Sequence, residues 1–175
     1  MPLTKAQRKF LVVEQAIGAG IGNFLLNAFF VWFTFPGERL LLWGFPGIAT
    51  DVLGTCFLLP WLTALVIGPF VRKAIRDGKL TPIVDVEPPQ FLRWVPAGPW
   101  HRSWVVGTAT TLAVAPPTIA LLMLFGVESA GRADFAIGKG IFAAALAAGV
   151  APLCAYFSLL EAKAAVAPNA TPVLE

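Results

Sequence analysis

The sequence predicts an all-α polytopic membrane protein with four transmembrane helices in a bundle. Its mean hydropathy is +0.75 and only 13% of its residues are charged, against about 25% in a soluble domain. Four long uncharged runs follow one another, at residues 15–37, 52–71, 103–127 and 140–160. Each reaches the roughly 20 apolar residues that cross a hydrocarbon core of about 30 Å. Residues 1–175 are therefore predicted to form a single four-helix membrane domain, with helices at about 10–35, 50–77, 103–127 and 137–161.

Basic residues are distributed unequally around the four runs. Ten lie before the first run, between the second and third, or after the fourth, and only Arg39, Arg132 and Lys139 lie on the other side. Because cytoplasmic loops are enriched in Lys and Arg, we expect both termini and the loop 79–101 to be cytoplasmic, in a multi-pass protein of the plasma (inner) membrane. The net charge of +3 then reflects topology and contact with the lipid bilayer, and it does not indicate nucleic acid.

Two amides lie in the middle of the first run. Asn23 and Asn27 are four residues apart, so they share one face of a helix. Asparagine in a membrane helix commonly bonds to a neighbouring helix, which contributes roughly 0.5 to 2 kcal/mol. Buried polar residues also mark the paths of ions, ligands and water. The sequence leaves both interpretations open.

Prolines occupy the middle of the other three runs, at Pro60, Pro116 and Pro152. A proline inside a helix removes one backbone hydrogen bond and crowds the preceding turn, so we expect kinks near the bilayer midplane. Many transporters use broken helices at this depth to present carbonyls to a substrate. The alternative is that the prolines only bend the helices for packing.

Further polar residues lie near the ends of the runs. Asp51 begins the second helix and is a candidate cap or a candidate outer mouth that attracts ions. Thr111, in the third run, is expected to bond back to its own helix or to line a wet path. The candidate solute path, or alternatively a polar cluster for helix packing, comprises Asn23, Asn27, Thr55, Pro60, Thr111, Pro116 and Pro152.

The fourth run carries a stripe of small residues at spacings of three or four. Such a stripe lets two helix backbones approach closely, which drives association in lipid. The sequence does not decide whether the stripe packs within the bundle or against another copy. Its members are Gly140, Ala144, Ala147, Ala151, Cys154 and Ser158.

Tryptophans are placed where membrane proteins anchor themselves to the headgroup region. Trp43 lies in the apolar segment 40–45, which is too short to span and is predicted to lie at the interface. Trp94, Trp100 and Trp104 belong to a Pro/Trp-rich stretch with interleaved arginines. That stretch is typical of a segment lying on the cytoplasmic membrane surface, and docking of a protein partner is the alternative.

The residues that several kinds of site require are absent from the sequence. His101 is the single histidine and the two cysteines lie at different predicted depths, so we expect no metal site, no cofactor and no disulfide. There is neither a serine or cysteine triad nor a phosphate-binding glycine motif. We therefore expect that the protein is not an enzyme.

Two functions fit these features. The first is a small permease or channel subunit for an unidentified small solute or ion, with its path near the asparagines and prolines. The second is a non-catalytic accessory or structural subunit of a larger membrane complex, docked through the fourth helix and the aromatic loop. The expected protein partners are further copies of the chain or other membrane subunits.

Overall fold

The computed structural model describes residues 3–35, 37–83 and 98–166, with side chains as far as residue 162. The protein is mostly helical (80%) and has four helices long and apolar enough to cross a membrane, as predicted. Two three-residue strands, β1 and β2, complete the described elements. The helices are α1 (Lys5–Lys9), η1 (Phe10–Gly18) and α2 (Ala19–Thr34), which form the first span, then α3 (Ile48–Arg76), α4 (Pro99–Leu124) and α5 (Arg132–Val166).

The first span starts with a capping box and contains an unpredicted π-helix. The backbone N–H of Gln7 donates to Thr4 Oγ1 (3.2 Å), and the backbone N–H of Thr4 donates to Gln7 Oε1 (2.8 Å). These two bonds satisfy donors that a helix start leaves free. The chain then widens into the nine-residue π-helix η1, a rare element that mostly occurs as single turns, before α2 continues to Thr34.

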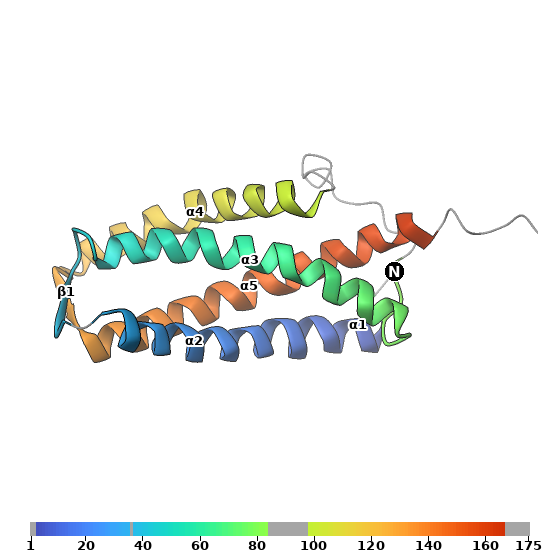
Figure 1. The fold of residues 1–175 in the computed structure, drawn as a ribbon, viewed down its shortest axis with the longest axis horizontal. Helices are drawn as coiled ribbons and strands as arrows, with labels where there is room; N and C mark the ends of the chain where they lie inside the picture. Colours follow the sequence, from blue (N-terminus) through green and yellow to red (C-terminus); the bar gives the residue numbers. More distant parts are fainter. Residues whose placement is uncertain (1–2, 36, 84–97, 167–175) are drawn as a thin grey trace, which may run out of the picture.

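The helices pack in the order α2, α5, α3, α4 (Figure 1). The extensive helix interfaces are α2 with α5, α5 with α3 and α3 with α4, whereas α2 and α3 hardly touch. Within their most apolar stretches, α3 and α5 are 44% and 50% buried, against 11% for the first span and for α4. The inner pair α3 and α5 thus holds the protein together, and the first span and α4 are its outer layers.

The three proline-containing helices are continuous. The helix α3 runs from Ile48 to Arg76 through Pro60, and α4 and α5 likewise continue through Pro116 and Pro152. A proline removes only one donor from the helix, and the surrounding turns remain intact. The helices are therefore not interrupted at these prolines, and each proline leaves only the carbonyl four residues before it without its helical donor.

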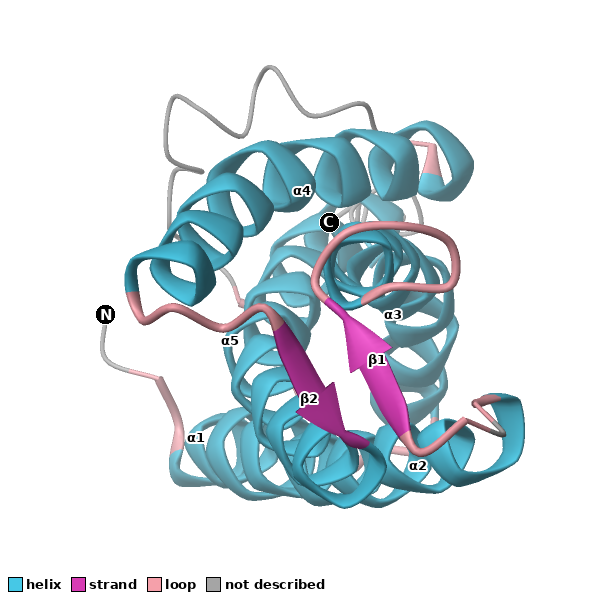
Figure 2. Cartoon of the chain, turned by 90° about the vertical axis from the view of Figure 1, so that its left-hand side faces the viewer, coloured by secondary structure: helices cyan, strands magenta, loops and turns pink. Residues whose placement is uncertain are grey.

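Strands β1 (Arg39–Leu41) and β2 (Ser129–Gly131) pair antiparallel across one end of the helices, which we call the strand end (Figure 2). Alternate side chains point to opposite sides of a strand. Accordingly Leu40 and Leu42 are buried in the core, whereas Leu41 and Trp43 are exposed. The apolar segment predicted to lie flat at the interface thus contributes two leucines to the interior.

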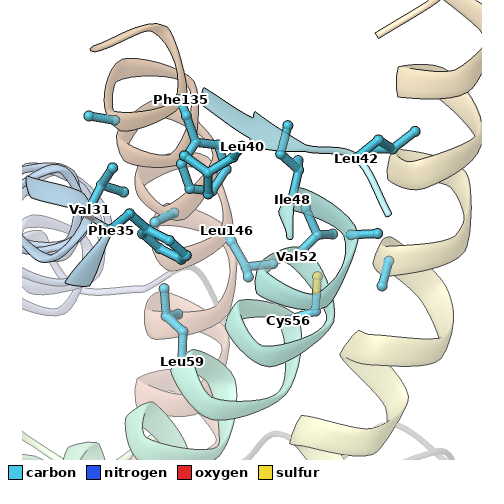
Figure 3. Packing of buried hydrophobic residues seen from close by; sticks show 14 of the residues in the cluster. Val31, Phe35, Leu40, Leu42, Ile48, Val52, Cys56, Leu59, Phe135 and Leu146 are labelled. Atoms are coloured by element: carbon cyan, nitrogen blue, oxygen red, sulfur yellow. The ribbon is translucent and has the colours of Figure 1, made fainter. Parts of the chain in front are cut away.

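The core at the strand end joins α2, α3 and α5, and α4 contributes Ala115 to it (Figure 3). The rings of Phe35 and Phe135 meet edge to face with centroids 5.7 Å apart, an arrangement that aromatic quadrupoles favour. Val31, Ile48 and Leu146 belong to the same cluster. This cluster ties α2, α3 and α5 together at the strand end. At the opposite end, which we call the terminal end, α1 begins and α5 finishes (Figure 1).

The small-residue stripe of α5 packs inside the chain. Gly140 lies against Phe24 of α2, and a Cβ on Gly20 would lie 3.5 Å from the carbonyl oxygen of Ala144. The remaining members Ala147, Ala151, Cys154 and Ser158 are all buried. Small residues at these positions let α2 and α3 approach α5 closely, so the stripe is occupied by the chain's own helices.

Candidate functional site

A groove runs between α2 and α3, the two helices that hardly touch. It has a volume of about 990 Å³ and is lined from Gln15 to Phe35 on one wall and from Gly47 to Phe70 on the other. At 1.5 Å per residue the walls are roughly 30 Å long, which matches the thickness of a hydrocarbon core. Ala151 of α5 lines the groove between the two walls. The groove arises because both walls pack on α5 rather than on each other.

Asn23 and Asn27 lie together on the α2 wall of the groove. Asn23 Nδ2 donates to the carbonyl of Ala19, and Asn27 Nδ2 donates to the carbonyl of Asn23, each at 2.9 Å. Carbonyl oxygens only accept hydrogen bonds, so both amides must turn their nitrogens to the helix. Their oxygens therefore remain available as acceptors, and neither side chain bonds to another helix within the described residues.

Threonines continue the polar lining toward the strand end. Thr34 donates its hydroxyl to the carbonyl of Phe30 (2.6 Å), and Thr50 donates to the carbonyl of Gly44 (2.8 Å). Each hydroxyl oxygen keeps lone pairs that can accept. Thr55 and Thr63 line the α3 wall. The groove thus sets hydrogen-bond acceptors, and the remaining N–H and O–H donors of its amides and threonines, among apolar side chains.

An ion pair lines the groove near the strand end. Lys139 Nζ of α5 lies 2.5 Å from Asp51 Oδ1 of α3, and the two side chains are only 10% and 14% exposed. Asp51 does not cap α3, because the N-cap position is Gly47 and no side chain bonds to it. The carboxylate instead neutralises a lysine, so this mouth of the groove carries a balanced pair of charges.

The predicted polar cluster is only partly brought together. Thr55 lines the groove with the two asparagines, and Pro60 is fully buried in α3. Thr111 donates its hydroxyl to the carbonyl of Gly107 (2.8 Å) in α4, the helix farthest from the groove. Pro116 is exposed on α4, and Pro152 is half-buried on α5 outside the groove lining. The predicted residues of the four helices therefore do not meet in one polar site.

The interfacial tryptophans form a group at the α3–α4 contact. Trp100 and Trp104 are about half exposed and pack edge to face with Trp61, at centroid distances of 5.4 and 6.2 Å. Trp43 is exposed beside the strand end. Trp94 and most of the predicted loop lie outside the described residues.

Five polar groove residues are not among the predicted site residues, namely Gln15, Thr34, Thr50, Thr63 and Lys139. The charge pattern places Lys139 only among the basic residues outside the fourth run. Its position seven residues into α5 is a usable signal, since a lysine inside a membrane helix needs a carboxylate partner. Gln15 and Thr63 carry no comparable signal.

No group of three or more metal-ligating side chains occurs among the described residues. Cys56 and Cys154 are both buried, free thiols. Neither thiol lines the groove.

Comparison with known protein families, with curated proteins and with solved structures finds no match to this chain. The geometry of the groove is consequently the basis on which a function is assigned.

Proposed function

We propose that the protein is a small permease or channel subunit, and that a small solute or ion moves along the groove between α2 and α3. The observation that carries the proposal is the groove itself. It is about as long as a hydrocarbon core is thick, and Asn23 and Asn27, whose amide oxygens form no hydrogen bond in the described chain, line it midway. Acceptors at that depth replace part of the hydration shell of a solute that donates hydrogen bonds.

The lining favours a particular class of solute. The hydroxyl protons of Thr34 and Thr50 are used in bonds to backbone carbonyls, whereas each asparagine keeps its amide oxygen and one of its two N–H donors for the solute. A monovalent cation, an ammonium or a neutral donor such as urea suits such a lining. Asp51 is neutralised by Lys139, so the groove offers no uncompensated carboxylate to trap a divalent cation.

The groove is open along one side, and the proposal requires another chain to complete the path. A second copy or another membrane subunit placed against α2 and α3 would cover the exposed edge. The distribution of basic residues, ten against three, supports an orientation with the terminal end in the cytoplasm and the strand end outside, in the plasma membrane.

The proposal is tested by flux into liposomes that contain the purified full chain. Swelling or dye assays with potassium, ammonium, methylammonium and urea should reveal at least one solute that enters faster than in empty liposomes. Asn27→Leu should lower that flux by about tenfold or more, because losing the acceptor removes roughly one hydrogen bond to the moving solute.

Phe29→Leu is the matched control for Asn27→Leu. Phe29 is on the same helix, is 62% exposed and does not line the groove, so this variant should transport normally. Equal flux in Asn27→Leu and wild-type liposomes would remove the groove as the path. Flux no faster than in empty liposomes for all four solutes would remove the transport proposal.

The apolar character of most groove residues favours one alternative, a non-transporting accessory subunit. In that case the groove takes a transmembrane helix of a larger complex. Ala151 is 1% exposed and lines the groove, so Ala151→Leu should fill part of the space and release a co-purifying subunit. Unchanged assembly in this variant would count against the accessory role.

A further inference from the structure

A buried arginine lies at the terminal end, far from the groove's strand-end mouth. Arg102, near the start of α4, is 3% exposed, which is rare for an arginine unless its charge is paired. Nη1 lies 2.5 Å from Glu161 Oε2 of α5. The carboxylate approaches outside hydrogen-bonding geometry, and this buried nitrogen forms no hydrogen bond in the described chain. Nη1 is therefore occupied by the carboxylate, and Arg102 can donate to a further ligand through its other nitrogens.

A second arginine converges on the same place. Gly68 of α3 has no side chain, and the position that its Cβ would take lies 3.5 Å from both Arg102 Nη2 and Arg72 Nη1. Ser158 Oγ lies 3.7 Å from that position. The glycine thus leaves room for about a methyl group, bordered by one guanidinium nitrogen from each arginine and by the Ser158 hydroxyl, which donates its own proton to the carbonyl of Cys154 (2.9 Å).

The charges around this space do not balance. Arg102 and Arg72 contribute two positive charges, and Glu161, whose side chain is 42% exposed, contributes one negative charge. Arg72 has no ion-pair partner within residues 3–35, 37–83 and 98–162. An anion with several oxygens would correct the imbalance, and planar guanidinium groups match phosphate oxygens well.

The site lies at the depth where phosphate groups occur in a bilayer. Arg102 is two residues from both Trp100 and Trp104, so all three lie within about 6 Å along the helix axis. Both tryptophans are about half exposed, and tryptophan is enriched at the level of the headgroups. Basic pockets between membrane helices at this level bind anionic headgroups.

We propose that Arg102 and Arg72, grouped around Gly68, form a binding site for a phosphate group. The phosphate belongs to an anionic lipid headgroup or to a soluble phosphate compound, and the two sources share this chemistry. The site is separate from the groove, so this proposal does not depend on the proposed transport function.

The test is lipid binding to the purified full chain, measured by native mass spectrometry with phosphatidylglycerol and with phosphatidylcholine. Phosphatidylglycerol should bind more tightly. Arg72→Gln should weaken that binding by about tenfold, the equivalent of one charge-assisted hydrogen bond. Arg72 is exposed, so its replacement leaves the core unchanged. Gly68→Leu should weaken binding as well, because the new side chain fills the space while both arginines remain.

Lys73→Gln is the control, since it removes the same charge from an exposed neighbour that does not approach Gly68. It should change lipid binding by less than about twofold. Equal weakening by Lys73→Gln and Arg72→Gln, or equal binding of the two lipids together with no response to phosphate, would overturn the proposal.

Inorganic phosphate added to the delipidated protein distinguishes the two sources. Thermal stabilisation that disappears in Arg72→Gln would support the site and assign it to a soluble phosphate compound. Selective binding of phosphatidylglycerol without a response to inorganic phosphate would support the site and assign it to lipid.

Discussion

Two ion pairs, one near each end of the helices, have the same separation and different surroundings. Asp51 and Lys139 lie 2.5 Å apart, and their side chains are only 14% and 10% exposed. Arg102 and Glu161 also lie 2.5 Å apart, but the arginine is 4% and the carboxylate 42% exposed. The first pair is balanced and enclosed, and it joins α3 to α5. The second is half open, and the neighbouring Arg72 adds a positive charge beside it, which is the basis of the anion site proposed above. Separation alone does not define the role of an ion pair.

The largest expected effect comes from breaking the enclosed pair. Lys139→Met leaves the Asp51 carboxylate buried without a counter-charge, which should lower the free energy of unfolding by about 3 to 5 kcal/mol. The measurement is reversible unfolding of the purified protein in mixed detergent micelles. The double variant Asp51→Leu with Lys139→Met should recover most of this loss, because no isolated charge remains. If the double variant is no more stable than Lys139→Met, the pair is not the cause.

Gly140 near the strand end and Gly68 near the terminal end differ in how much free space surrounds them. A Cβ on Gly140 would lie 2.9 Å from the ring of Phe24 and 3.2 Å from its carbonyl oxygen. Gly140→Ala should therefore cost about 1 to 3 kcal/mol of unfolding free energy through overpacking. A Cβ on Gly68 would meet only side-chain atoms, at ordinary contact distances of 3.5 Å or more. Gly68→Ala should therefore change the unfolding free energy by less than about 0.5 kcal/mol. Equal losses in the two variants would contradict this difference in packing.

A smaller effect is expected from opening the exposed pair. Glu161→Gln replaces a partly solvated carboxylate by an amide and leaves the buried Arg102 guanidinium without a counter-charge, so we expect a loss of about 1 to 2 kcal/mol in neutral detergent, between the values for exposed and buried pairs. Adding phosphatidylglycerol should restore the unfolding temperature if an anion replaces the carboxylate. Restoration by phosphatidylcholine to the same extent would argue for a general lipid effect.

The smallest effect is expected midway between the ends. Within the described residues the Asn27 amide bonds to its own helix. Asn27→Leu should therefore change the unfolding free energy by less than about 0.5 kcal/mol. Asparagines that join two helices contribute more, roughly 0.5 to 2 kcal/mol. A loss above about 1 kcal/mol would indicate that Asn27 bonds to another helix or to a second chain. This measurement also separates a stability defect from the transport defect expected for the same variant.

The main outline of the fold could be predicted from the sequence because lipid imposes a strict requirement. A chain crossing a hydrocarbon core must satisfy every backbone donor and acceptor internally, so four apolar runs of sufficient length indicate four helices. Spacing along one helix was equally informative. Asn23 and Asn27 share a face, and the stripe from Gly140 to Ser158 faces other helices, because these relations depend only on about 3.6 residues per turn.

The tertiary structure alone decided which helices meet and what lies between them. Asp51 meets Lys139 across 88 positions of sequence, and Arg102 meets Glu161, because α5 packs between the first span and α3. The same packing order separates α2 from α3 and opens the groove, and it keeps Thr111 and Pro116 away from it. Helix pairing in a membrane depends on close packing and polar contacts rather than on a hydrophobic difference between faces. The residue pattern of one helix therefore does not identify the helix against which it packs.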